Sequence, residues 1–282
     1  MNPLLKWAGG KRKLLPLIFE YINKDELAKT GNKLYEPFVG GGSLFLNLEL
    51  SRCSINDYNP ELINTYIQIR DNPLKLINLL EEHKKNHSLE YYTSIRALDR
   101  RVDYSNYDDI KKAARFIYLN KTCYNGLYRV NSKGFFNVPM GKYENPDIVA
   151  QDRILRISEY LNSNEIEITL GDFESAVLTA ETGDVIYFDP PYDYEKEGFT
   201  SYVSNGFTRD DLKRLRKCCD SLVDIGCKVI ISNNDTEFVN TLFNDQRYTI
   251  KKIEVQRLIG SSNKSRRKEK EVIIYGKDYR RY

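Results

Sequence analysis

Histidine and cysteine are scarce in this chain. Two histidines and five cysteines occur among its 282 residues, and no two cysteines have the C-x-x-C spacing of a zinc site. Histidine is the usual base beside a nucleophilic serine or cysteine, so its scarcity excludes most enzymes of that kind. The odd number of cysteines argues against a disulfide framework and suits a reducing cytoplasm. His83 and His87 have i, i+4 spacing, but no third ligand lies near them in the sequence, and we predict no metal site.

Long apolar runs are also missing. No stretch of about 18 apolar residues occurs, so no membrane-spanning helix is expected, and the first residues lack the apolar core of a signal peptide. Apolar residues make up 41% and charged residues 29%, as in a soluble globular protein, which we expect in the cytoplasm. The net charge of +3 does not indicate nucleic-acid binding by itself, but five of the seven residues in 264–270 are basic. The distribution of charge is therefore more informative than its sum.

The clearest chemical signal is a buried strand that ends at a carboxylate. Val185–Phe188 are β-branched or aromatic, as in a strand covered on both faces. Two prolines then end the strand, because neither can donate a hydrogen bond to a neighbouring strand. Ligands bind at the carboxyl ends of strands in open α/β sheets. Asp189-Pro-Pro-Tyr192 therefore predicts a ligand site with a carboxylate, stiff carbonyls and an aromatic ring; an ordinary turn is the alternative.

A glycine turn follows an earlier short strand. Gly40–Gly42 precede an apolar helical face, an arrangement that lets the backbone approach a cofactor in doubly wound folds. The full G-x-G-x-x-G spacing is missing, which argues against a nicotinamide cofactor. Asp57 ends the next strand, 15 residues past Gly42, close to where such folds place a carboxylate on ribose hydroxyls. Asn59 and Pro60 can begin the following helix, which leaves Asp57 for a ligand.

The remaining pattern predicts one α/β domain with an insertion. Residues 1–60 and 164–282 alternate strands with helices, whereas residues 61–163 have mainly helical periodicity. The part from 164 to 282 is expected to end with a strand near Tyr248–Gln256, a polar basic loop at Ile259–Lys270 and a last strand at Glu271–Tyr275. Within the insertion, Leu127–Val130 and Phe135–Val138 flank the turn at residues 131–134, which predicts a β-hairpin. Its basic and aromatic side chains would suit a DNA groove, and a purely structural ribbon is the alternative.

Taken in order, these motifs resemble those of the Dam-type DNA adenine-N6 methyltransferases, the D12 group of class α. The resemblance covers nearly the whole chain. It implies a Rossmann-like methyltransferase sheet, a helical target-recognition insertion, double-stranded DNA as substrate and S-adenosylmethionine as methyl donor. The motifs that carry it are Lys6–Lys11, Glu36–Gly42, Asn56-Asp57, Tyr124–Arg129, Phe136–Pro139, Gly171–Phe173 and Asp189–Tyr192.

The resemblance also implies roles for single residues. Asp189, Pro190 and Tyr192 would form the catalytic motif. Tyr124 and Asn125 match positions used at the target base step. Positions that read the sequence GATC are matched by Leu127, Arg129 and Pro139, whereas Tyr128 and Lys133 stand where the pattern varies. A phosphate-contacting segment is matched by Lys264, Arg266 and Arg267. The S-adenosylmethionine pocket would be lined by Trp7, Lys11, Phe38, Gly40, Gly42, Asp57, Asp172, Phe173 and Asp189.

The chemistry of adenine methylation explains why these residue types are needed. The exocyclic amine of adenine is a poor nucleophile, and a carboxylate with a carbonyl could accept both of its N–H bonds, an interaction that strengthens as positive charge develops. Good orientation can remove about 7–11 kcal/mol from such a barrier. A base inside a duplex must be flipped, at a cost of a few kcal/mol, which stacking on Tyr192 would partly recover. Neither a covalent intermediate nor a metal is required.

Other protein classes fit less well. A cytosine-N4 methyltransferase more often has serine in place of Asp189, and a protein-glutamine methyltransferase typically has asparagine there. A catalytically silent DNA-binding regulator has no need of a methyl-donor pocket. We expect a monomer, encoded by a bacterium or phage. Such an enzyme can belong with a cognate restriction endonuclease that is not its physical partner.

Overall fold

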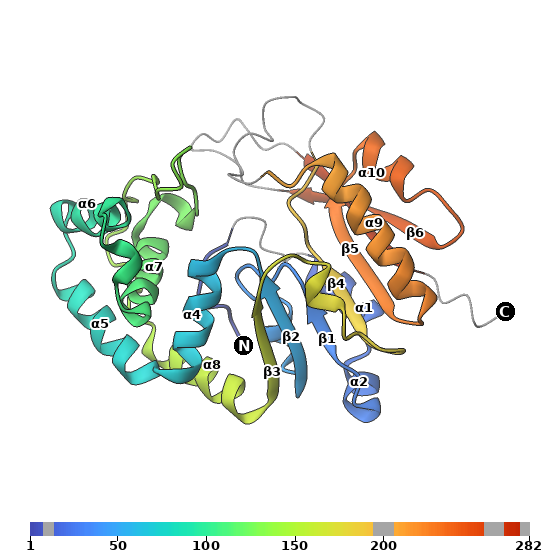
Figure 1. Ribbon diagram of the computed structural model, residues 1–282, viewed down its shortest axis with the longest axis horizontal. Coiled ribbons are helices and arrows are strands. Elements are labelled where there is room, and N and C mark those ends of the chain that lie inside the picture. Colours follow the sequence, from blue (N-terminus) through green and yellow to red (C-terminus); the bar gives the residue numbers. More distant parts are fainter. Residues whose placement is uncertain (8–13, 194–205, 257–267, 277–282) are drawn as a thin grey trace. The chain divides into compact units, whose positions relative to one another are not determined.

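The computed structural model describes residues 1–7, 14–193, 206–256 and 268–276 (Figure 1). Within these ranges seven strands occur among helices along the chain, which confirms the α/β class expected from the sequence. The chain divides into two compact units: the first comprises Met1–Arg12 and Val39–Asp172, the second Lys13–Phe38 and Phe173–Tyr282. None of the described helices combines the length and apolar character needed to span a bilayer.

The second unit contains five strands in the order β1-β4-β5-β7-β6. β1, β4 and β5 are parallel, whereas β7 is antiparallel to both β5 and β6. The expected bounds of β4 and β6 are confirmed. The expectation that residues 268–270 form a loop is wrong, because they continue the ladder between β7 and β6. The bounds are β1 (Leu34–Glu36), β4 (Val185–Phe188), β5 (Lys228–Asn234), β6 (Tyr248–Gln256) and β7 (Lys268–Gly276).

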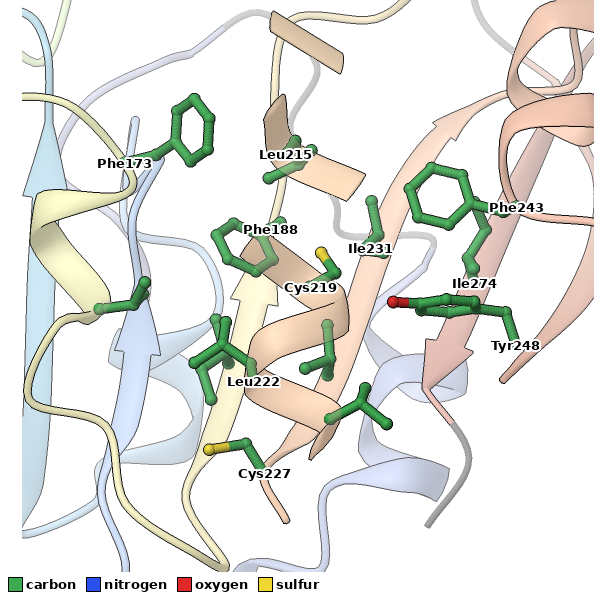
Figure 2. Close-up of a cluster of buried hydrophobic side chains, with 14 of the residues drawn as sticks. Phe173, Phe188, Leu215, Cys219, Leu222, Cys227, Ile231, Phe243, Tyr248 and Ile274 are labelled. Atoms are coloured by element: carbon green, nitrogen blue, oxygen red, sulfur yellow. The ribbon is translucent and has the colours of Figure 1, made fainter. Parts of the chain in front are cut away.

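Helix α9 (Arg209–Asp224) covers the core of the second unit (Figure 2). Thr208 begins the helix in a capping box: its side chain accepts the N–H of Asp211, whose carboxylate accepts the N–H of Thr208. Apolar residues then recur at helical spacing and are buried with β4, β5 and β7, each leucine contributing about 1.5–3 kcal/mol. These residues are Leu212, Leu215, Cys219 and Leu222. The unit also contains α1 (Leu15–Tyr21), α2 (Lys24–Thr30) and α10 (Glu237–Leu242).

The first unit is mainly helical and contains the parallel pair β2 (Arg52–Asp57) and β3 (Glu165–Leu170). The predicted start of the helical region is confirmed: Asn59 accepts the N–H groups of Glu61 and Leu62, and Pro60 occupies the first turn. Helix α3 (Phe45–Leu48), after the glycine turn, is only one turn long. The helices of the predicted insertion are α4 (Pro60–Asp71), α5 (Pro73–Lys85), α6 (Leu89–Ala97), α7 (Asp109–Thr122) and α8 (Gln151–Ser163).

Both histidines pack in the helical part of the first unit. His83 Nδ1 lies 2.8 Å from the Tyr91 hydroxyl, and the His83 ring stacks on Tyr118 with centroids 4.9 Å apart. His87 Nδ1 lies 2.9 Å from the Tyr118 hydroxyl. Burial disfavours the charged imidazolium and lowers the pKa of His83 to about 4. Each histidine therefore has a tyrosine partner that suits a neutral ring.

The histidine pKa shift predicts a loss of stability in acid. The folded-state pKa of His83 lies below that of the unfolded chain, so the stability from its neutral ring is complete above about pH 6.5 and declines as the pH falls towards about 4. The shift corresponds to at most about 3 kcal/mol. We expect His83→Gln, which cannot titrate, to lose less unfolding free energy over this range, measured by urea denaturation. His87→Gln is the matched control, because burial lowers its pKa less; equal losses in wild type and His83→Gln would contradict the assignment.

Candidate active site

The Asp57 carboxylate joins the glycine turn to the start of α4. Asp57 Oδ2 accepts the N–H of Gly40 at 3.1 Å, and Oδ1 accepts the N–H of Asn59 at 3.0 Å. Burial raises the pKa of Asp57, and these backbone hydrogen bonds oppose that rise. Gly40 has φ +49° and Gly42 φ +73°, a left-handed conformation that favours glycine. The structure thus brings together the glycines and the carboxylate that the sequence singled out.

Trp7 packs directly on this glycine turn. A Cβ atom at Gly40 would lie 2.7 Å from Trp7 Cδ1, and one at Gly41 would lie 3.0 Å from Trp7 Cβ. Tyr66 also fixes the turn, because its hydroxyl donates to the Gly40 carbonyl at 2.9 Å. Lys11, also expected near the cofactor, lies outside the described residues.

The segment after β3 begins beside Asp57. The Gly171 N–H donates to the Asp57 carbonyl at 3.2 Å, and Asn56 Nδ2 donates to the Gly171 carbonyl at 2.9 Å. These bonds fix the backbone that leads to Asp172, which is partly buried. The Gly171–Asp172 end of β3 and the Asp57 end of β2 therefore lie together, as expected for parallel strands.

The two phenylalanines expected at the adenine ring lie in the second unit. Phe38 and Phe173 stack with their centroids 5.5 Å apart and an interplanar angle of 27°. Phe207 meets Phe38 edge-on at 5.5 Å, and the Arg214 guanidinium lies 5.1 Å from the centre of the Phe173 ring. Phe173 is only 4% exposed and belongs to the apolar core of its unit, whereas Phe38 is only partly buried.

Asp189 follows the last residue of β4 and is oriented by the neighbouring strand. Phe188 pairs with Ile231 of β5, which brings Ser232 alongside Asp189. Ser232 Oγ donates to Asp189 Oδ1 at 2.7 Å and lies 3.0 Å from the Tyr187 hydroxyl. Pro190 is buried, and Asp189 is partly buried. The carboxylate thus stands at the carboxyl end of a parallel strand, as the sequence predicted.

Tyr192 is anchored through its hydroxyl, which donates to Glu271 Oε2 of β7 at 3.2 Å. Burial raises the pKa of Tyr192 well above its usual range, so the hydroxyl stays protonated and can donate. This bond fixes the tip of the side chain to a strand of the same sheet as Asp189.

The predicted hairpin is a short ribbon with two isolated bridges, Val130 to Phe136 and Cys123 to Met140, in place of two regular strands. The N–H of Asn137 donates to the Arg129 carbonyl at 3.0 Å, and the N–H of Tyr124 donates to the Pro139 carbonyl at 2.9 Å. The N–H groups of Lys133 and Phe135 donate to Asn131 Oδ1, and these local hydrogen bonds complete the turn. The structure thus brings Tyr124 beside Pro139.

The side chains of this ribbon that the resemblance singles out are mostly exposed. Arg129 is exposed and donates through Nε to Asn137 Oδ1 at 2.7 Å. Tyr124 is 41% exposed, and Asn125 is exposed with φ +55°. Pro139 is exposed as well, and Leu127 is partly buried. Lys264, Arg266 and Arg267 lie outside the described residues.

Comparison with known proteins identifies the family. The model of the D12 class N6 adenine-specific DNA methyltransferases matches residues 7–259. This chain belongs to that family.

The methyltransferase has relatives along nearly its whole length. It is 45% identical over 276 residues to Type II methyltransferase M1.LlaDCHI of Lactococcus lactis subsp. cremoris, spanning 97% of this chain and 95% of the relative. Type II methyltransferase M.MjaIII of Methanocaldococcus jannaschii is 36% identical over 95% of this chain and 96% of its own length. DNA adenine methylase of Escherichia coli K12 is 32% identical over 95% of this chain and 93% of its own length.

One cluster beside the predicted catalytic motif of this methyltransferase was not predicted from the sequence. Asp193 is 5% exposed; its carboxylate is 3.0 Å from Arg209 Nε and accepts the Thr236 hydroxyl at 2.7 Å. Its N–H donates to Asn233 Oδ1 at 2.9 Å, and its carbonyl accepts Asn234 Nδ2 at 2.8 Å. Asp193 therefore holds the end of the Asp189–Tyr192 segment against the last residues of β5 and the start of α10. The sequence does show a carboxylate directly after Tyr192. Its partners could not be identified from the sequence, because they lie 16 to 43 positions away.

The contact between Trp7 and the glycine turn can be tested by fluorescence, because Trp7 is the only tryptophan. We expect Gly40→Ala to displace the indole and shift its emission, in addition to the left-handed strain of about 1–2 kcal/mol. Gly134→Ala is the matched control: its φ is +80°, but nothing lies within 4 Å of the added Cβ. It should lose comparable stability in thermal denaturation and keep the wild-type emission. An unchanged spectrum in Gly40→Ala would contradict the contact.

Proposed function

We propose that this enzyme transfers the methyl group of S-adenosylmethionine to the N6 amine of an adenine flipped out of duplex DNA, within the sequence GATC. The observation that carries the proposal is the Asp189 carboxylate, held by Ser232 at the end of β4. It is supported by the similarity to relatives, among them the DNA adenine methylases of Escherichia coli and Vibrio cholerae. Residues 61–163 would form the target-recognition insertion, and residues 1–60 and 164–282 the catalytic domain.

The surroundings of Asp57 suit the ribose of a nucleoside cofactor. Asp57 Oδ2 and Oδ1 accept the backbone N–H groups of Gly40 and Asn59, and an ionised carboxylate has about four acceptor sites in all. A ribose hydroxyl could therefore donate to the same carboxylate. The glycine turn lets the backbone approach the ligand closely, and Trp7 supplies an aromatic wall. When bound, S-adenosylmethionine would supply a methyl group activated by its sulfonium charge.

The role of Asp189 and Pro190 is to make the adenine amine nucleophilic. Accepting both N–H bonds at the carboxylate and the Pro190 carbonyl would draw the nitrogen lone pair out of conjugation with the ring. Ser232 fixes the carboxylate before the substrate arrives, so little reorganisation is needed during reaction. Tyr192, anchored at Glu271, would present its ring to the flipped base, and such stacking is worth about 1–3 kcal/mol.

Sequence recognition would depend on the exposed side chains of the ribbon. Arg129 is held by Asn137 through Nε, and a bidentate contact of such a guanidinium to guanine gives about 1–3 kcal/mol of discrimination. Lys264, Arg266 and Arg267 would add the salt-dependent attraction to phosphates. Two relatives are named Type II methyltransferases, which supports the proposal that this enzyme belongs with a cognate restriction endonuclease.

The catalytic proposal predicts that Asp189→Ala nearly abolishes methyl transfer but leaves DNA binding largely intact. Loss of a preorganised polar group of this kind costs about 10²–10³-fold in rate. The assay uses labelled S-adenosylmethionine and duplex DNA, followed by base analysis and methylation-sensitive digestion. Asp210→Ala, on the exposed first turn of α9, is the control and should keep wild-type activity. Label on cytosine, or on adenine outside GATC, would contradict the proposal.

The recognition proposal predicts different effects for two arginines. Arg129→Ala should lower discrimination at one guanine by about 1–3 kcal/mol. Arg266→Ala should weaken binding to all sequences and reduce the slope of log affinity against log salt by about 1. The discrimination and the salt slope are both measured by titrating each variant with GATC duplexes and single-base variants of them at several salt concentrations. A uniform loss across sequences in Arg129→Ala would refute its base-reading role.

A further inference from the structure

Tyr128, at a position where the family pattern varies, contacts two different parts of the first unit. Its ring stacks on Trp7 with centroids 5.8 Å apart and an interplanar angle of 19°. Its hydroxyl donates to Glu61 Oε2 of α4 at 3.4 Å. Phe116 and Phe136 also contact the ring, at 5.5 and 5.9 Å. Tyr128 directly precedes Arg129 on the ribbon, so any displacement of its backbone moves the adjacent arginine.

The contacts on either side of Tyr128 lead to the same carboxylate. On one side, Trp7 packs on Gly40, whose N–H donates to Asp57. On the other, the N–H of Glu61 donates to Asn59 Oδ1 at 3.0 Å, and the N–H of Asn59 donates to Asp57. The contacts form a closed ring of six residues, with Tyr128 as its member on the ribbon: Asp57, Gly40, Trp7, Tyr128, Glu61 and Asn59.

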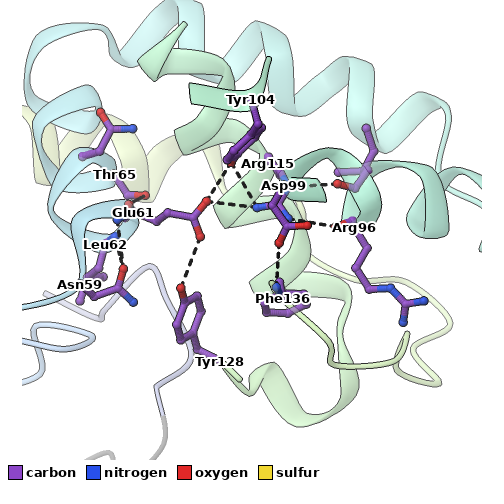
Figure 3. A network of polar contacts seen from close by, with 12 residues as sticks. Asn59, Glu61, Leu62, Thr65, Arg96, Asp99, Tyr104, Arg115, Tyr128 and Phe136 are labelled. Carbon is purple, nitrogen blue, oxygen red and sulfur yellow. Dashed lines mark hydrogen bonds and ion pairs between the residues drawn. The ribbon is translucent and has the colours of Figure 1, made fainter. Parts of the chain in front are cut away.

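The position of Glu61 in this ring is fixed by a buried ion-pair network (Figure 3). Arg115 of α7 is 2% exposed and lies 3.1 Å from Glu61 Oε1 and 2.9 Å from Asp99 Oδ2. The Tyr104 hydroxyl donates to Glu61 Oε1 at 2.8 Å. Asp99, in the short helix η1 (Leu98–Arg100), also accepts the N–H of Phe136 at 2.7 Å. Phe136 lies on the arm of the ribbon opposite Tyr128, and the network holds it through Asp99. Both arms of the ribbon are therefore tied to the helices.

We propose that Tyr128 is a positioning residue that couples the methyl-donor site to the recognition ribbon. The inference rests on the proposed function, because it takes Asp57 and Trp7 to hold the donor and Arg129 to read DNA. A nucleoside ligand that orders Trp7 and Asp57 also restrains the ring of Tyr128. Because Arg129 follows directly in the chain, the backbone of Tyr128 then restrains the position of Arg129. By linkage, binding of the correct duplex must tighten donor binding by the same factor.

The test measures this coupling without catalysis. The affinity of wild type for a GATC duplex and for a single-base variant is titrated with and without saturating S-adenosylhomocysteine. We expect S-adenosylhomocysteine, the product that the donor leaves after methyl transfer, to raise the preference for GATC by a factor in the usual range of coupling, about 5–150-fold. In Tyr128→Leu the factor should fall to about 1, while S-adenosylhomocysteine alone binds within about threefold of wild type. The reciprocal titration of S-adenosylhomocysteine against enzyme saturated with the GATC duplex or with the single-base variant must give the same factor.

Two further variants separate coupling from folding. Tyr128→Phe keeps the ring on Trp7 and loses only the hydrogen bond to Glu61, so its coupling factor should fall by about 2- to 10-fold. If Tyr128→Leu does not fold, the coupling factor of Tyr128→Phe tests the inference in its place. Tyr91→Leu, a tyrosine of α6 outside the ring, should keep the wild-type factor. A wild-type factor near 1, or an unchanged factor in folded Tyr128 variants, overturns the inference. Failure of wild type to bind S-adenosylhomocysteine would instead overturn the proposed function.

Discussion

The pair of backbone hydrogen bonds to the Asp57 carboxylate is the constraint on which the first unit depends. One bond comes from Gly40 in the glycine turn and the other from Asn59, which begins α4. The same carboxylate therefore sets both the shape of the turn and the direction in which α4 leaves β2. Helix α4 then returns the Tyr66 hydroxyl to the Gly40 carbonyl, which closes the arrangement. Burial costs the charged carboxylate solvation, and the two N–H donors offset part of that cost.

In the second unit the corresponding constraint is strand register. β4 has only four residues, but it pairs with β1 on one side and β5 on the other. The pairing of Phe188 with Ile231 makes Ser232 the neighbour of Asp189, and a shift of one residue would turn Ser232 to the opposite face. Glu271 of β7 pairs with Asn234 of β5 and so reaches Tyr192 from the next strand. The segment Asp189–Tyr192 is therefore held by side chains from strands that are distant in sequence.

The structural features that could be predicted from the sequence are those set by interactions between neighbouring residues. The prolines after β4, the Asn59 cap and the positive-φ glycines each act within a few residues, and the structure has them as expected. Ser232, Asp193 and Tyr128 could not be assigned from the sequence, because their partners are set by register and by packing between distant segments. The start of β7 was misassigned because Lys268–Lys270 are charged, and pairing with β6 outweighs their low β propensity.

The buried cluster around Arg115 determines the geometry of the ribbon that contains Tyr128 and Phe136 more than the stability of the unit. Removing one partner of such a pair typically costs about 3–5 kcal/mol, yet a well-packed apolar replacement of the whole cluster is often neutral or stabilising. An apolar cluster would offer no acceptor to the N–H of Phe136 or to the hydroxyl of Tyr128. Both bonds have directional requirements that apolar packing lacks. The ionic cluster therefore restricts the ribbon to one position over the helices.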